Sequence, residues 1–163
     1  FVSISISPLS LKLYIWVKIV FLYVMSIFSS LLIYVLIGIT SLSWAQFVVL
    51  ILISGLQVPL HALLINAFST NKVEGFVIMK ATGFLLVFPI ISYIFVDSKQ
   101  WLFAIAPGFW VTKATQAILL KPLIDAGIVD LGLGFWSFLI IGMGYTSLLI
   151  LGALRMFNKR VFQ

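Results

Sequence analysis

The residues of this chain with the most chemical capability are Ser54, Gln57 and His61: a hydroxyl, an amide and the only imidazole. At the α-helical rotation of about 100° per residue, the three lie within about 60° of one another on one helix face. They fall in a run without Lys, Arg, Asp or Glu that extends from Lys18 to Lys72. A polar stripe in so apolar a helix can line a transport pathway. Alternatively, it can hydrogen-bond to a neighbouring helix, which contributes about 1 kcal/mol.

Pro59 lies inside this stripe. Because proline has no backbone N–H, we expect the helix to be interrupted or kinked there. Other motifs give no support for catalysis: the sequence has no G-x-x-x-x-G-K-[ST] loop for ATP phosphates, no H-E-x-x-H motif and no cysteine. We therefore expect this chain to have no catalytic residues, no enzyme activity, and no bound cofactor or metal of its own.

A second group of candidate residues is N-K-V-E-G, Asn71 to Gly75, with Lys80 five residues further on. Charges are rare in this chain, at 9%, against about 25% in soluble domains. We predict that "STNKVEG" is a tight turn between two helices and that the Lys80 amine snorkels back to the interface. Glu74 has two open roles. Its carboxylate can cap the start of the next helix, or it can pair with a basic residue of a partner protein.

The elements that must position these residues follow from composition. The chain has 163 residues and is 63% hydrophobic, more apolar surface than a soluble fold of this size could bury. A bilayer core about 30 Å thick requires roughly 20 helical residues for each crossing. The predicted spans cover residues 13–39, 45–68, 76–96 and 131–154. The apolar runs between the last two spans are too short to cross, because Pro107-Gly108 interrupts them. We expect an external re-entrant or interfacial segment over residues 101–124.

The predicted fold is therefore an all-α integral membrane protein with four transmembrane helices and a re-entrant segment, in one domain over residues 1–163. Four crossings place both ends and the "NKVEG" region on one side of the membrane. That side carries seven of the ten basic residues: Lys12, Lys18, Lys72, Lys80, Arg155, Lys159 and Arg160. The positive-inside rule makes it cytoplasmic, so we expect a multi-pass protein of the cell membrane with both termini of this segment inside. The net charge of +6 then reports topology, and no basic and aromatic groove pattern points to nucleic acid.

Two stretches, "NAFSTNKVEGFVIMKATGFLLVFPIISYIF" and "WLFAIAPGFWVTKA", resemble the C-terminal half of a type-2 ABC transporter permease, the membrane subunit of bacterial drug and lipid exporters. The similarity is carried by N-K-V-E-G, by Lys80 and by the spacing of Trp101, Pro107 and Trp110. "SPLSLKLYIWVK" is similar to the segment after the first cytoplasmic loop of such permeases, and "RMFNKR" to their basic tails. The resemblance implies that the chain holds the last four spans of a six-span permease. Its start at Phe1 rather than Met fits that expectation.

The resemblance also implies a function. Permeases of this family work as dimers, each bound on its cytoplasmic face by an ATP-binding cassette subunit that binds ATP-Mg. The chain would then form the substrate pathway of an ATP-driven exporter, with Ser54, Gln57 and His61 as candidate lining residues. The residues Asn71, Lys72, Glu74 and Gly75 would contact the ATPase. Expected partners are that ATPase, a second permease copy or homologue, and the lipid bilayer.

The intramembrane His61 and Lys80 keep an alternative open, an ion- or proton-coupled secondary transporter or channel. No substrate motif of the family is matched. The compound, the direction of transport, the choice between homo- and heterodimer, and the identity of the ATPase therefore stay open.

Overall fold

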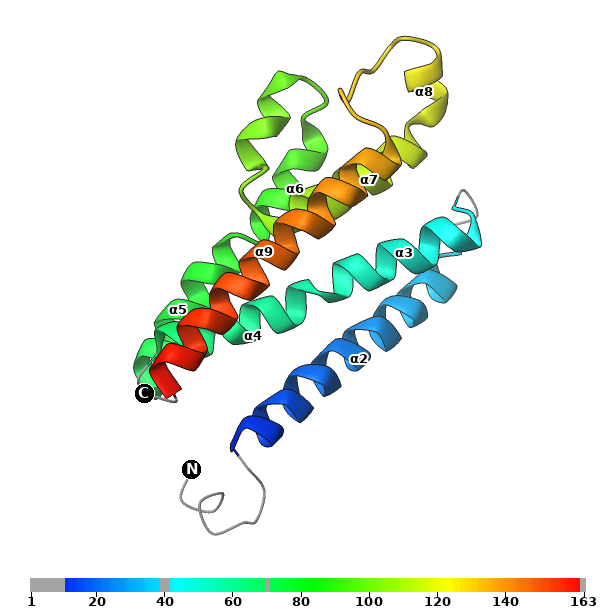
Figure 1. Ribbon diagram of the computed structural model, residues 1–163. Helices are drawn as coiled ribbons and strands as arrows, with labels where there is room; N and C mark the ends of the chain where they lie inside the picture. Colours follow the sequence, from blue (N-terminus) through cyan, green and yellow to red (C-terminus); the bar gives the residue numbers. More distant parts are fainter. Residues whose placement is uncertain (1–10, 39–41, 70, 162–163) are drawn as a thin grey trace.

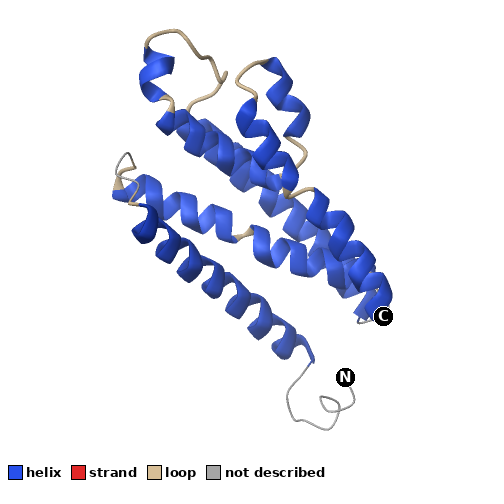
Figure 2. Cartoon of the chain, turned by 180° about the vertical axis from the view of Figure 1, so that it is seen from behind, coloured by secondary structure: helices blue, strands red, loops and turns tan. Residues whose placement is uncertain are grey.

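The computed structural model describes residues 11–38, 42–69 and 71–161, and the regular elements within these ranges are all helices (Figures 1 and 2). The four spans are α2 (Leu11–Ile37), α3 with α4 (Trp44–Gly55 and Gln57–Phe68), α5 with α6 (Lys72–Phe84 and Val87–Ile94), and α9 (Phe135–Val161). Each is long and apolar enough to cross a membrane. The predicted all-α membrane fold is confirmed.

Two of the spans are interrupted, and each interruption precedes a proline. The second span changes from α3 to α4 at Leu56, and the third changes from α5 to α6 at Leu85 and Leu86. Pro59 and Pro89 are each the third residue of the helix that follows. A missing N–H costs no bond at that position, because the first N–H groups of a helix have no partner within it. The interruption beside Pro59 was predicted, whereas the one beside Pro89 was not.

The third span begins earlier than predicted, at Lys72 rather than near residue 76. Asn71 is its N-cap, and its side-chain Oδ1 accepts a hydrogen bond of 2.9 Å from the backbone N–H of Glu74. The prediction that N-K-V-E-G belongs to a tight turn was wrong, because this cap starts the helix. Glu74 lies in the first turn of α5, where the helix dipole favours a carboxylate.

The first and last spans also differ from their predicted limits. Gly38 follows α2 with φ +66° and ends the helix, while the predicted end at residue 39 lies outside the described residues. Gly132 has φ +75°, a left-handed conformation that delays the start of α9 to Phe135. At its other end α9 continues through the basic segment with Arg155, since basic residues are good helix formers that the dipole favours near a C-terminus.

Between the third and fourth spans the chain turns back on itself, as Figure 1 shows. It runs back along α6 as the 3-10 helix η1 (Ser98–Phe103) and returns outward as α7 (Pro107–Leu119) and the short α8 (Lys121–Asp125). None of these helices is long enough to be a candidate span. The segment therefore folds as a helical hairpin that adds no further candidate span, and the hairpin begins slightly before residue 101. We call residues 98–125 the re-entrant hairpin.

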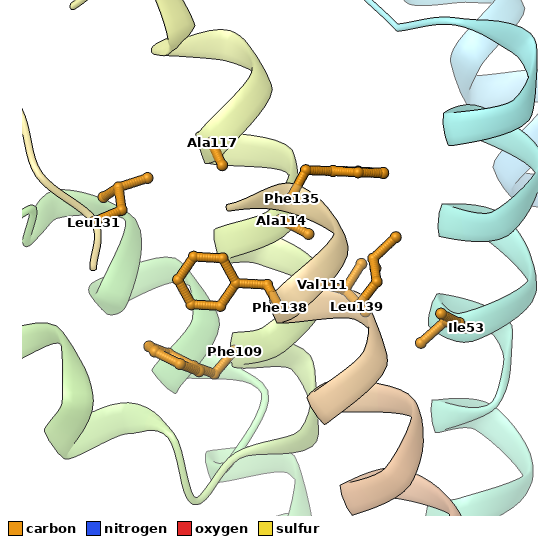
Figure 3. Close-up of a cluster of buried hydrophobic side chains, with 9 residues drawn as sticks. All are labelled: Ile53, Phe109, Val111, Ala114, Ala117, Leu131, Phe135, Phe138 and Leu139. Atoms are coloured by element: carbon orange, nitrogen blue, oxygen red, sulfur yellow. The ribbon is translucent and has the colours of Figure 1, made fainter. Parts of the chain in front are cut away.

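The larger of two core clusters joins the hairpin to the fourth and second spans. Its members come from α3, from α7, from the loop before α9 and from α9 (Figure 3): Ile53, Phe109, Val111, Ala114, Ala117, Leu131, Phe135, Phe138 and Leu139. A smaller cluster lies where α4 meets α9, around Leu60, Leu63 and Phe157. In contrast, none of the described side chains of α2 is buried. Its large exposed apolar side chains suit contact with lipid.

The two ends of the helix bundle differ in charge. The start of α2, the α4–α5 connection and the end of α9 lie together (Figure 1), and we call this the terminal end. The charged side chains described in these parts are Lys18, Lys72, Glu74, Lys80, Arg155 and Lys159. Around the hairpin the exposed charges are Asp97, Lys99, Lys121, Asp125 and Asp130. The Lys80 amine lies 4.6 Å from the centre of the Phe76 ring, so it points back towards the start of α5.

Candidate functional site

The predicted stripe of Ser54, Gln57 and His61 lies across the interruption of the second span. All three side chains are partly buried. The Ser54 hydroxyl donates a hydrogen bond of 3.0 Å to the carbonyl of Ile51, and His61 Nδ1 lies 2.7 Å from the carbonyl oxygen of Gln57. The hydroxyl and the imidazole thus bond to the backbone of their own span. Gln57, the first residue of α4, is the member that meets another segment.

Gln57 meets the tip of the re-entrant hairpin at Gly108. A Cβ atom added to Gly108 would lie 3.0 Å from Gln57 Oε1 and 2.6 Å from Pro89 Cγ. The second span, the hairpin and the third span are therefore in contact at this point, and the approach is so close that any side chain on residue 108 would force its neighbours to shift. We call Gln57, Pro89 and Gly108 the junction. Irregular backbone that protein buries at membrane depth is typical of the sites of transporters.

Two hydroxyl groups of α2 bind the interrupted second span from its other side. In a regular helix the Leu56 N–H would bond to the carbonyl of Leu52, but here it bonds three residues back. The Tyr23 hydroxyl donates 3.0 Å to that Leu52 carbonyl, and Ser26 Oγ lies 3.4 Å from the carbonyl oxygen of Gly55. A Cβ on Gly55 would be 3.0 Å from both of these α2 side chains. The polar face of α2 thus packs where the second span is broken.

Lys113 and Gln116 form a buried polar group that sequence reasoning did not find. Both side chains lie on α7 and are almost fully buried, at 0% and 1% exposed. The Lys113 amine donates 2.6 Å to the carbonyl of Phe95 and 2.7 Å to Gln116 Oε1, while Gln116 Nε2 donates 2.9 Å to the carbonyl of Tyr93. Burial lowers the pKa of Lys113 to about 8, against the opposing influence of Asp97, which raises it. We call this group the clamp.

The sequence does carry a signal for the clamp. Lys113 and Gln116 are three residues apart, and such residues are neighbours on a helix surface. Neither residue was singled out in the sequence analysis above. An amine and an amide adjacent on an otherwise small and apolar helix indicate a buried partner, because isolated polar groups are costly to bury.

The proposed ATPase-contact residues gather at the terminal end. Asn71, Lys72 and Glu74 are exposed, and Gly75 is partly buried. A Cβ on Gly75 would lie 3.6 Å from the side chain of Ser69, an ordinary contact. These four residues present the capped first turn of α5, a rigid surface rather than a loop.

The glycines of α9 do not share one role. A Cβ on Gly142 would overlap the Cβ of Trp110 in the hairpin, whereas Gly144 and Gly152 have nothing within 4 Å. Of these three glycines, Gly142 is therefore the one at which close helix packing requires the absence of a side chain. Within the described ranges, no three His, Cys, Asp or Glu side chains are grouped so that they could hold a metal ion.

Comparison with known proteins gives one positive result. Curated proteins and solved structures provide no match. Residues 1–154 match the family described as "Fluoroquinolones export permease protein Rv2686c-like". The match takes in the hairpin, the junction and the clamp, and it agrees with the resemblance to exporter permeases. The chain therefore belongs to the Rv2686c-like family of export permeases, and it is a multi-pass membrane permease.

Proposed function

We propose that this chain is the transmembrane subunit of an ATP-driven exporter whose substrates are fluoroquinolones. The observation that carries the proposal is the family match over residues 1–154, and the substrate class comes from the description of that family. ATP-Mg is bound and hydrolysed by a separate ATP-binding cassette subunit. A second copy of the permease, or a homologue, completes the pathway.

The substrate passes the stripe and the junction. A fluoroquinolone is a fused aromatic ring system that carries a carboxylate and, in most members, a basic amine, so it requires a few polar contacts between apolar walls. The Gln57 amide can both donate and accept hydrogen bonds. Ser54 and His61 flank it on the same span. The partial burial of all three side chains and the contact of Gln57 with the hairpin support this assignment.

The terminal end faces the cytoplasm and docks the ATPase. Among its described charged side chains, Lys18, Lys72, Lys80, Arg155 and Lys159 are basic and Glu74 is acidic, as the positive-inside rule requires. The capped start of α5, Asn71 to Gly75, is the contact surface. Because it is helical, it can transmit movement of the ATPase directly to the third span.

Everted membrane vesicles that contain the full permease and its copurifying ATPase test the function. Fluoroquinolone uptake should start on addition of ATP-Mg, stop with vanadate and persist when an uncoupler dissipates the proton gradient. The alternative, a proton-coupled transporter that uses the intramembrane His61, predicts the opposite response to vanadate and uncoupler. Transport that follows the proton gradient and ignores ATP would overturn the proposed function.

A further inference from the structure

The helices α6 and α7 pack against each other, and two of their contacts carry the inference. At the tip of the hairpin, Gly108 lies against Pro89. Further along, the clamp joins Lys113 and Gln116 to the last carbonyl groups of α6. A short stretch of α7 therefore connects the clamp directly to the junction.

The clamp provides hydrogen-bond donors for the carbonyl groups at the end of α6. The last four carbonyl groups of a helix have no donor within the helix, and they are costly to bury unpaired. Lys113 and Gln116 supply N–H groups to the carbonyls of Phe95 and Tyr93. Both partners of the amine are neutral oxygen atoms, so the interaction is directional hydrogen bonding near a helix C-terminus, where a positive charge is also favoured.

Apolar contacts alone would not set the position of the hairpin. Phe88 of α6 and Phe95, the residue that follows α6, contact the ring of Phe103 in η1, but apolar contact is non-directional and allows sliding. Ser92 is the buried residue of α6, and its hydroxyl bonds to the carbonyl of Pro89 within the same helix. Among the hydrogen bonds of the described residues, those of the clamp are thus the directional link between α6 and α7, while the Tyr145 hydroxyl of α9 donates 2.7 Å to the carbonyl of Ile105 in the hairpin.

We propose that Lys113 is a positioning residue for export: it fixes α7 against the end of α6, which places Gly108 against Gln57 and orients the Gln57 amide towards the substrate. This inference rests on the proposed function of Gln57 as a pathway residue. The buried amine of Lys113, which lies outside the four spans, thereby affects substrate recognition at the junction.

The transport test compares three variants in the ATP-driven vesicle assay. Lys113→Met keeps most of the length of the side chain and removes both of its hydrogen bonds. The half-saturating fluoroquinolone concentration should rise roughly fivefold, the effect of one hydrogen bond lost between the displaced Gln57 amide and the substrate. Lys113→Arg keeps donors and charge and should restore most of the apparent affinity. Lys121→Met is the control, because Lys121 is an exposed lysine of the same hairpin, and it should behave as wild type. A merely structural role would instead lower the maximal rate and leave the half-saturating concentration unchanged.

A labelling test reads the position of α7 without transport. The chain has no cysteine, and Ser92 is 0% exposed, so Ser92→Cys introduces one protected thiol. In detergent micelles, N-ethylmaleimide should label this thiol slowly in the wild-type and Lys113→Arg backgrounds and faster in Lys113→Met. Ser98→Cys, at an exposed position, gives the rate for a free thiol.

The outcomes separate the two proposals. Equal labelling and equal half-saturation in wild type and Lys113→Met would overturn the positioning role. If Lys113→Met does not fold, Gln116→Met takes its place: it retains the bond from the amine to Phe95 but loses the bonds of Gln116 to Tyr93 and Lys113. It should show the same changes, and wild-type behaviour would overturn the role. Absence of ATP-driven export by the wild type would refute the proposed function, and the labelling result would still decide whether Lys113 positions the hairpin.

Discussion

The second and third spans each pass from one helix to another just before a proline, yet the two interruptions have different surroundings. In the most apolar stretch of the second span 33% of the residues are buried, against 6% in the corresponding stretch of the third span. The α3–α4 pair contacts α2, α7 and α9, whereas α5–α6 is covered mainly by α4 and by the hairpin. The interruption of the second span is therefore packed among several helices, whereas the long polar side chains of α7 hold the third span beyond its interruption, at the end of α6.

The comparison separates two roles of a proline. Pro59 and Pro89 define where a new helix can start, because each removes one N–H in a first turn. Neither proline determines what the free carbonyls bind. Hydroxyl groups of α2 reach the second span, and an amine and an amide of α7 reach the end of the third. The donors of α2 thus act at the interruption of the second span, whereas the donors of α7 act at the end of α6, beyond the interruption of the third span.

Gly108 touches both interrupted spans, so its substitution should have the largest effect. Gly108→Ala places a Cβ 2.6 Å from Pro89 Cγ, and overpacking of this kind costs about 1–3 kcal/mol. We expect a lower midpoint of thermal unfolding in detergent, and a further decrease for Gly108→Val. Gly144→Ala is the control, since that glycine has nothing within 4 Å. Equal stability of Gly108→Ala and wild type would mean that the three segments do not meet as closely as described.

The clamp should make the third span sensitive to alkaline pH. The pKa of Lys113 in the folded protein, about 8, lies below its ordinary value of 10.5. Between these values the unfolded chain binds more protons, so the free energy of unfolding should rise as pH increases from about 8 to 10.5 and be lost again as pH falls. Thermal unfolding across this range measures the effect, with Lys113→Gln as the comparison. A slope that persists in Lys113→Gln would assign it to other groups.

Removal of the Tyr23 hydroxyl of α2 should destabilise the second span only slightly. Tyr23→Phe deletes the donor to Leu52, and an intramembrane hydrogen bond of this kind contributes about 0.6–1 kcal/mol. The third span should be unaffected, as the Ser92→Cys labelling rate would report. Ser29→Ala is a matched control, because the Ser29 hydroxyl bonds only within α2, to Met25, among the hydrogen bonds described. Faster labelling in Tyr23→Phe would show that the two interruptions are coupled.

Glu74→Gln should have the smallest effect on stability. Its carboxylate is exposed in the first turn of α5, where the interaction with the helix dipole contributes about 0.3–1 kcal/mol. If the carboxylate pairs with the ATPase, substrate-stimulated ATP hydrolysis should decrease while expression and insertion remain normal. If substrate stimulates ATP hydrolysis in the reconstituted Glu74→Gln complex as much as in the wild type, the role of Glu74 is limited to stabilising the start of α5.

Sequence patterns predicted the spans better than their ends. Apolar runs of sufficient length are visible without any tertiary information, and Pro59 is conspicuous among polar neighbours. Pro89 also lies beside a helix interruption, but its sequence neighbours are apolar, so the sequence analysis did not predict that interruption. The N-cap role of Asn71 was also missed, because a capped helix start and a turn have the same composition.

The candidate site was predictable only in part. The stripe of Ser54, Gln57 and His61 follows from spacing alone, but the contact of Gln57 with Gly108 joins segments 51 residues apart in the numbering of the chain. The burial of Lys113 was equally hidden, since its partners are backbone carbonyls of Tyr93 and Phe95. Backbone groups are present at every residue, and no sequence pattern marks which of them will be left without a donor.

The sequence by itself determined that the described part of this chain holds four helical segments long and apolar enough to cross a membrane, where one of them can be interrupted, and which end carries the positive charge. These properties depend on local composition, because each helix satisfies its own backbone and each apolar run meets the thickness of the bilayer. Only the tertiary structure decided which position has no room for a side chain, which hydroxyl group binds an interrupted helix and which lysine is buried. Those properties depend on the distance between helices, and close packing brings together residues that no local pattern relates.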